Sequence, residues 1–291
     1  MRAISEDFAT AMTEKRAGPE ASRVADPVLV ELLRLLAKVP ALVERAESCA
    51  VGLSRAGSLE AADRASPVGM HVGALARLKL AIAGDHLMAM FLICHGEATL
   101  PIWAHFSLLR TAAECAIDVL WLLDPDQSSE TRVARGVGRL LDALEQRALG
   151  EAEVPSLMAP GQSMAQRRVE ELLAEAEVAA VTPALFPGTT QLAKTIKAMG
   201  LGQDAYTIRY LDGIAEGVPW AAVLGDQRDV VNEDRSGGIV RIRTSADPLM
   251  TWYATLATIR QFQAAIESLE SYTRRPLAPA RPADSELPSS R

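Results

Sequence analysis

The chain has 291 residues, of which 49% are apolar, 23% are charged and 4% are aromatic. That length is enough for one large domain or two small ones with a true hydrophobic core. The 30 basic and 37 acidic residues give a net charge of -7. This balance argues against a broad electrostatic grip on nucleic acid or on an anionic membrane.

Cysteine usage and hydropathy predict a cytoplasmic protein. Cys49, Cys94 and Cys115 are too far apart for a C-x-x-C site, and each lies in an apolar stretch, so we expect buried free thiols in a reducing compartment. The first residues are charged rather than apolar, which predicts no secretory signal. The longest strongly apolar run, Leu87 to Cys94, is far shorter than the ~20 residues that a bilayer requires.

Helix signals dominate the chain. Asp26 followed by Pro27 predicts a capped helix start, and Pro40 either starts a second segment or kinks the first. Ser66 and Pro67 repeat the cap-plus-proline pattern before a helix that Gly96 ends. Thr99 and Pro101 are predicted to open the next helix, which ends at Asp124-Pro125. Further helices are predicted at about 129–149, 163–179, 190–199, 204–215 and 247–273, with loops at 150–162 and 180–189.

These patterns predict an all-α helical bundle of about eight helices, with one short β-hairpin near 228–243. Residues 26–273 form a single predicted domain. The segments 1–25 and 274–291 offer little apolar surface, and the second is rich in proline, so both are predicted to be disordered tails.

The charged row on the 100–123 helix is the clearest local pattern. Arg110, Glu114 and Asp118 recur at every fourth position and line one face, with Trp121 near its end. A helix this apolar has little surface to spare, so the row either meets water or is buried and paired. We expect a structural Arg110–Glu114 ion pair, and the alternative is the wall of a binding pocket.

Four histidines fall within a short stretch, at positions 71, 86, 95 and 105. None forms the i, i+3 or i, i+4 pair with another histidine that metal sites in helical bundles use. We therefore expect no metal and no cofactor, and imidazoles that bond to neighbouring backbone or carboxylate groups. The chain also lacks the common glycine-rich phosphate loops and the G-x-S-x-G nucleophile motif.

Short motifs in two helices resemble a group of actinobacterial helical proteins related to the HEPN (higher eukaryotes and prokaryotes nucleotide-binding) domains. The matching features are an R-x-x-x-E motif, a W-L-x-D-P motif and a later arginine and glycine in the segment that ends at Trp220. In this chain they are Arg110 to Glu114, Trp121 to Pro125, Arg209 and Gly217. The resemblance covers about residues 70–270, and it implies a homodimer.

The chain departs from that group at the residues that carry its chemistry. In active HEPN ribonucleases, the resemblance implies, the arginine holds the phosphate and a histidine assists attack by the RNA 2′-hydroxyl. Here Glu216 stands in the histidine position, and Asp212 stands where the group often has serine. Two acidic side chains make a poor phosphate site, so Arg209 has a second interpretation, in which it pairs with Asp212 or Glu216 at an ordinary helix end.

Three functions follow as hypotheses. The first is a non-catalytic or degenerate binding or regulatory component, in a stress or defence system as the resemblance implies, with RNA or a nucleotide as a candidate ligand. The second is an active, metal-independent ribonuclease that uses Arg209 and Glu216. The third is a small-molecule sensor with a pocket near His86, His105, Glu114 and Trp121. Trp220 and Asp212 complete the set of candidate binding residues.

Overall fold

An all-α helical bundle is confirmed. The computed structural model describes residues 27–52, 54–96, 102–153, 163–186, 205–218, 221, 226–234 and 239–274. The predicted helix at 190–199, Trp220 and nearly all of both predicted tails lie outside these residues. The helices are α2 (Pro27–Leu36), α3 (Val39–Val51), α4 (Leu59–Asp63), α5 (Met70–Gly96), α6 (Ala104–Leu122), α7 (Ser129–Glu153), α8 (Met164–Val178), α10 (Ala205–Ala215) and α12 (Pro248–Arg274).

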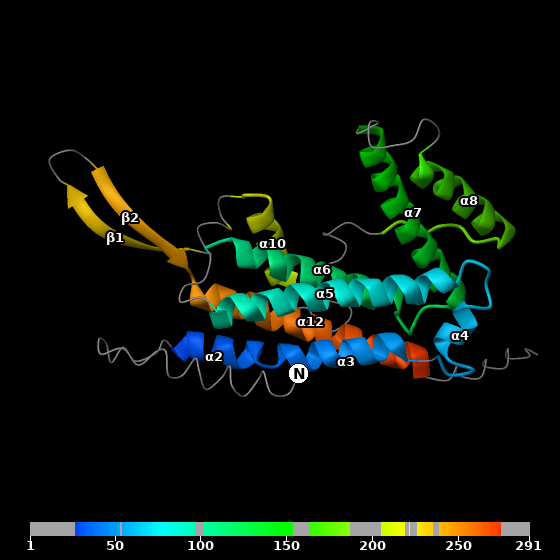
Figure 1. The fold of residues 1–291 in the computed structure, drawn as a ribbon, viewed down its shortest axis with the longest axis horizontal. Coiled ribbons are helices and arrows are strands. Elements are labelled where there is room, and N and C mark those ends of the chain that lie inside the picture. The colour runs from blue at the N-terminus through cyan, green and yellow to red at the C-terminus, as the bar shows by residue number, and fades with distance from the viewer. Residues whose placement is uncertain are drawn as a thin grey trace, which may run out of the picture.

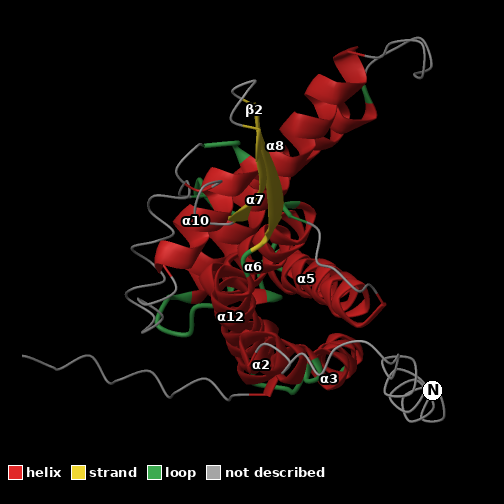
Figure 2. Cartoon of the chain, turned by 90° about the vertical axis from the view of Figure 1, so that its left-hand side faces the viewer, coloured by secondary structure: helices red, strands yellow, loops and turns green. Residues whose placement is uncertain are grey.

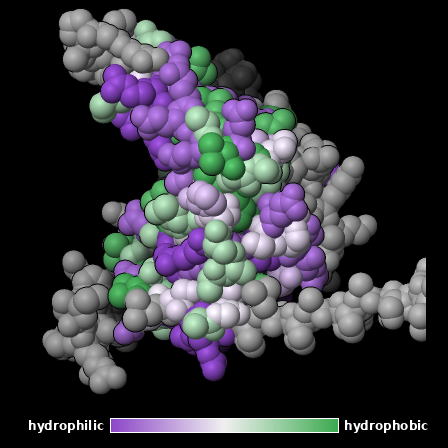
Figure 3. Space-filling model, turned by 90° about the vertical axis from the view of Figure 1, so that its right-hand side faces the viewer, coloured by the Kyte–Doolittle hydropathy of each residue, from purple (hydrophilic) through white to green (hydrophobic). Residues whose placement is uncertain are grey.

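Three long helices form the centre of the bundle. α6 packs against α5 and against α12, and α2 and α3 cover the outer side of that layer (Figure 1). α10 lies on α6, while α7 and α8 pair with each other and project from one end (Figures 1 and 2). Figure 3 views the molecule from that end, and the surface is concave beside the projecting helices α7 and α8. The core that joins the three central helices includes Leu87, Phe106 and Phe262, all fully buried.

Proline and cap signals placed some helix starts correctly and others not. α2 begins at Pro27, and α3 has Pro40 in its first turn. The prediction that Ser66 and Pro67 open a helix is wrong, because residues 64–69 form turns and α5 begins at Met70. The reason is a close approach: a β-carbon on Gly69 would lie 1.7 Å from the Asp63 carbonyl oxygen.

Two other helix boundaries also differ from the predictions. α6 begins at Ala104 rather than at Thr99 to Pro101, and α7 continues through Glu153 into the predicted loop at 150–162. The short helix α4 was not predicted, since five residues are too few to show a periodic pattern. Ser58 caps it by accepting a hydrogen bond from the Ala61 N–H at 3.2 Å.

Two buried ionic groups hold α4 against the rest of the bundle. Arg132 on α7 donates two hydrogen bonds to Asp63, at 2.9 and 2.8 Å, and the Tyr272 hydroxyl donates a third at 3.0 Å. Glu60, also fully buried, accepts hydrogen bonds from Arg64 and Arg77. Buried charges need such partners, because an unpaired ion in the interior is very costly.

Residues Asp226–Asp234 (β1) and Ile239–Ala246 (β2) are arranged as an antiparallel pair, with Asp226 opposite Ala246 and Asp234 opposite Ile239. The pair extends away from the bundle in Figure 1. It adds nothing to the helical core that defines the fold class. The confirmed fold is the helical bundle alone, and the hairpin near 228–243 stays a prediction.

The longest apolar helix is α5. By length and composition alone, Met70–His95 is apolar enough to cross a membrane, with a mean hydropathy of 1.4 over the test window. A core helix of a soluble protein passes the same test. In this structure α5 packs on α6, α3 and α7, and 33% of that window is buried inside the bundle. Cytoplasmic location and the absence of a membrane remain expectations from the sequence.

All three cysteines are free and buried, as predicted. Burial raises the pKa of Cys49 to about 11, of Cys94 to about 12 and of Cys115 to about 11. A thiol with such a pKa is almost entirely protonated at neutral pH, and the thiolate is the reactive form. These side chains therefore act as small core residues.

Candidate functional site

Arg110 lies at the junction of α6 and α10. Its Nη2 is 3.0 Å from Glu114 Oε1, one turn along α6, and its Nε donates to Asp212 Oδ1 on α10 at 3.0 Å. The predicted Arg110–Glu114 ion pair is confirmed. The second pair joins two residues that the sequence had marked separately, because α10 packs on α6. Both Arg110 and Glu114 are partly exposed.

Asp118 belongs to a different group of charges. It is only 2% exposed, and it pairs with Lys79 on α5 at 2.8 Å and with Arg139 on α7 at 2.6 Å. One carboxylate thus links three helices. The candidate row on α6 is therefore divided: Arg110 and Glu114 face α10 and solvent, while Asp118 is part of a buried joint.

Trp121 is buried in packing contacts. Its ring meets Phe186 edge to face, with centroids 5.1 Å apart, and the Arg135 guanidinium lies 4.9 Å from its ring centre. Both geometries are favourable for an aromatic side chain. The structure places this tryptophan between α7 and the segment after α8, where it stabilises the fold.

Arg209 and Glu216 are both exposed. Arg209 lies on α10, and Glu216 follows the helix directly. The interpretation that Arg209 pairs with Asp212 does not hold, since Asp212 bonds to Arg110, and within the described residues Arg209 makes no ion pair. The helix end itself forms as predicted. Gly217 adopts φ +67, and the Val218 N–H donates to the Gly213 carbonyl, the bonding pattern of a glycine-terminated helix.

The electrostatic environment of Arg110 is acidic. Burial opposes the charge on the guanidinium, but the Asp212 hydrogen bond and the charges of Glu114, Asp212 and Glu216 together raise its pKa. Burial also raises the pKa of Glu114, with the charges of Asp212 and Asp118 acting in the same direction and that of Arg110 opposing them. One cation therefore stands among three carboxylates, and any further anion at this place would be repelled.

Three of the four histidines have a hydrogen-bond partner within the described residues, and for two of them it is the expected backbone carbonyl. His86 and His95 each bond through Nδ1 to the backbone carbonyl four residues earlier, and His105 Nε2 lies 3.0 Å from Thr251 Oγ1. Within the described ranges, no group of three His, Cys, Asp or Glu side chains is placed to hold a metal ion.

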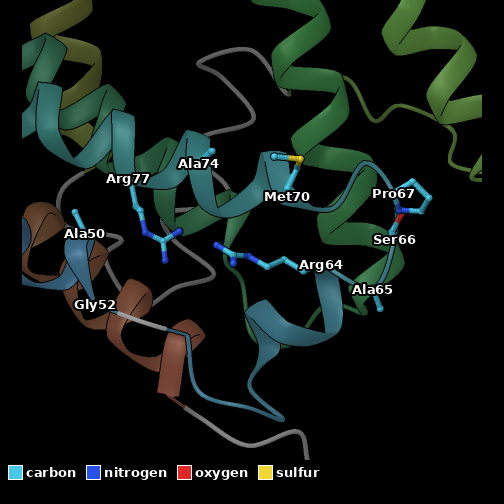
Figure 4. Close-up of a pocket in the computed structure, with 9 residues that line it drawn as sticks. All are labelled: Ala50, Gly52, Arg64, Ala65, Ser66, Pro67, Met70, Ala74 and Arg77. Atoms are coloured by element: carbon cyan, nitrogen blue, oxygen red, sulfur yellow. The ribbon is translucent and has the colours of Figure 1, made fainter.

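Sequence reasoning did not identify a pocket at the amino-terminal end of α5, lined by Arg64 and Arg77 (Figure 4). The one local signal is the i, i+4 spacing of Glu60 and Arg64. That spacing is common on exposed helices, and nothing in it indicates that Glu60 is fully buried. The predicted sensor pocket near His86, His105, Glu114 and Trp121 does not coincide with this one.

Comparisons of the chain with protein-family models, with curated proteins and with solved structures give no match.

Proposed function

We propose that the protein is a non-catalytic, HEPN-like binding component that acts as a cytoplasmic homodimer, with a stress or defence system as its setting. The observation that supports the non-catalytic part is the state of Arg110. Its guanidinium is occupied by Glu114 and Asp212, at 3.0 Å each, with Glu216 near enough to raise its pKa further. The family relationship and the setting come from the motif resemblance.

Phosphodiester cleavage needs positive charge where the phosphate binds and where negative charge develops in the transition state. At this junction the acidic residues outnumber the cation three to one. Arg209, the arginine that the resemblance assigns to the phosphate, is exposed on α10, and Glu216 is exposed directly after the same helix. On this proposal, the negative charge of Glu216 in the histidine position weakens phosphate binding at Arg209.

The variants Glu216→His and Asp212→Ser test whether the scaffold has lost a nuclease site. They restore the residues that the resemblance implies, in an assay with labelled single-stranded RNA and EDTA. On the proposal, wild type does not cut, and the double variant binds RNA more tightly because two negative charges are gone. Arg167→Ala, which alters an exposed arginine on α8, is the control. Cleavage by wild type that Arg209→Ala removes would establish the ribonuclease alternative.

The homodimer is supported by a stripe on the outer face of α5 that is apolar except at Asp85. Positions spaced alternately by three and four residues are exposed or partly exposed there, the spacing of a helix–helix seam. Leu78 is 56% exposed and Leu92 is 57% exposed, and a second helix packed on this face would bury both side chains. The stripe consists of Leu78, Ala81, Asp85, Met88 and Leu92.

A charge placed on the stripe separates dimerisation from folding. Leu78→Glu with Leu92→Glu is expected to give a monomer by light scattering while the circular dichroism spectrum stays helical. Val178→Glu is the matched control, because Val178 is 86% exposed on α8, away from the stripe. A wild-type mass of 31.2 kDa would remove the dimer from the proposal.

A further inference from the structure

A pocket of about 680 Å³ lies between the carboxyl-terminal end of α3, the turns after α4 and the first turns of α5. Its volume is in the range of small-molecule sites. Arg64 and Arg77 reach into it from two different elements, with their guanidinium groups turned toward each other (Figure 4). Ser66, Pro67, Met70 and Ala74 form the rest of the wall that matters here.

Both guanidinium groups are fixed by one buried carboxylate. Arg77 donates from Nη1 and Nη2 to the two oxygens of Glu60 at 2.9 Å each, and Arg64 donates from Nη2 to Glu60 Oε1 at 2.8 Å. Burial alone would raise the pKa of Glu60, but its two arginine partners outweigh that effect and lower it. Glu60 stays ionised, and the group of three side chains has one excess positive charge.

Gly73 on α5 leaves room for the ion pair between Arg77 and Glu60. A β-carbon at this position would lie 2.6 Å from Arg77 Nη1 and 2.8 Å from Glu60 Oε1. The ion pair passes directly over the helix where a side chain would otherwise stand. Glycine is unfavourable in a helix interior, and its presence here is explained by the position of these charges.

One hydrogen-bonding side chain remains available at the wall. Arg64 uses only Nη2 on Glu60, and its side chain is 55% exposed, so Nε and Nη1 can meet a ligand. Ser66 Oγ is buried and has no hydrogen-bond partner among the described residues. A hydroxyl this deeply buried is out of reach of a ligand, so it is no part of the proposed contacts.

The geometry points to a binding site for a small organic anion, with its phosphate or carboxylate group on Arg64 and its apolar part against Met70, Pro67 and Ala74. Arg77 neutralises Glu60, this pair positions Arg64, and Arg64 carries the excess positive charge. No described residue that lines the pocket is acidic, so an anion meets no repelling neighbour at the wall itself. The site shares no residue with the Arg110 junction, so it stands or falls independently of the proposed function.

Calorimetric titration of the full chain with phenyl phosphate and with benzoate tests the site and separates the two head groups. Saturable binding of at least one probe is expected, weakening as salt is raised, and inorganic phosphate should bind less tightly because it lacks the apolar part. Arg64→Met should weaken binding at least tenfold while the circular dichroism spectrum stays helical, since the Arg77–Glu60 pair persists.

Arg34→Met is the control, because Arg34 is an exposed arginine that pairs one turn away with Glu31 on α2. It should bind both probes as wild type does. Absence of saturable binding of both probes at millimolar concentration would overturn the proposal. Binding that Arg64→Met leaves intact would do the same, because it would place the anion elsewhere.

Discussion

Replacing Arg132 by methionine should be among the most damaging single changes in this chain. Arg132 is 1% exposed, and it donates two hydrogen bonds to Asp63, which is fully buried. Methionine keeps much of the side-chain volume but removes the positive charge. Asp63 would then keep only the Tyr272 hydroxyl as a described side-chain partner, so its negative charge would be largely uncompensated in the interior.

The expected cost follows from that uncompensated charge. Removing one partner of a buried ion pair destabilises proteins by about 3–5 kcal/mol. For a helical unit of this size, each kcal/mol lowers the melting temperature by about 2–4 °C, so Arg132→Met should lose roughly 6–20 °C. Tyr272→Phe removes only the third hydrogen bond, to a charged acceptor, and should cost about 1.5–3 kcal/mol.

Arg168→Met is the matched comparison. Arg168 also contacts two carboxylates, Glu171 at 3.1 Å and Glu175 at 2.9 Å, but its side chain is 35% exposed on α8. Surface pairs of this kind contribute about 0–1 kcal/mol. Urea unfolding followed by circular dichroism gives the free energy of each variant. Equal losses for Arg132→Met and Arg168→Met would refute the reasoning that burial, rather than pairing, sets the cost.

Three further outcomes are expected. Gly138→Ala should destabilise α7, because a β-carbon would lie 1.9 Å from the Ala184 carbonyl oxygen. A β-carbon at Gly150 would have nothing within 4 Å, so Gly150→Ala should stabilise α7 by about 0.5–1 kcal/mol in thermal melts. Arg45 holds the pKa of Glu270 at about 2, below the free value of about 4.3. This pair therefore stabilises the fold above about pH 5, and its contribution fades toward pH 2. Glu270→Gln should flatten the dependence of the unfolding free energy on pH in that range. At pH 8 the three thiols should resist a thiol-specific dye until urea unfolds the chain.

The local signals in the sequence predicted most of the described helices but only some of their boundaries. α2 begins at its proline, and α10 ends at Ala215, two residues before Gly217. The errors came where tertiary contacts decide. α5 begins at Met70 because the chain first passes against the Asp63 carbonyl, and no pattern around Ser66 reports that contact.

The candidate site was predictable one helix at a time. The spacing of Arg110 and Glu114 gave their ion pair, but the bond from Arg110 to Asp212 joins positions 102 residues apart and depends on how α10 docks. For the same reason, the sequence did not predict the pairing of Arg132 with Asp63, which lies 69 residues away. Nothing in the sequence near Arg132 distinguishes a buried guanidinium from an exposed one.

Incubation of the wild-type protein with end-labelled single-stranded RNA in EDTA tests the central claim most directly. The account predicts intact RNA after prolonged incubation at high protein concentration, because Glu114 and Asp212 occupy the Arg110 guanidinium and Glu216 stands in the histidine position. Cleavage by the wild type that disappears in Arg209→Ala and persists in Arg167→Ala would contradict it, and would make Glu216 the working base of an active ribonuclease.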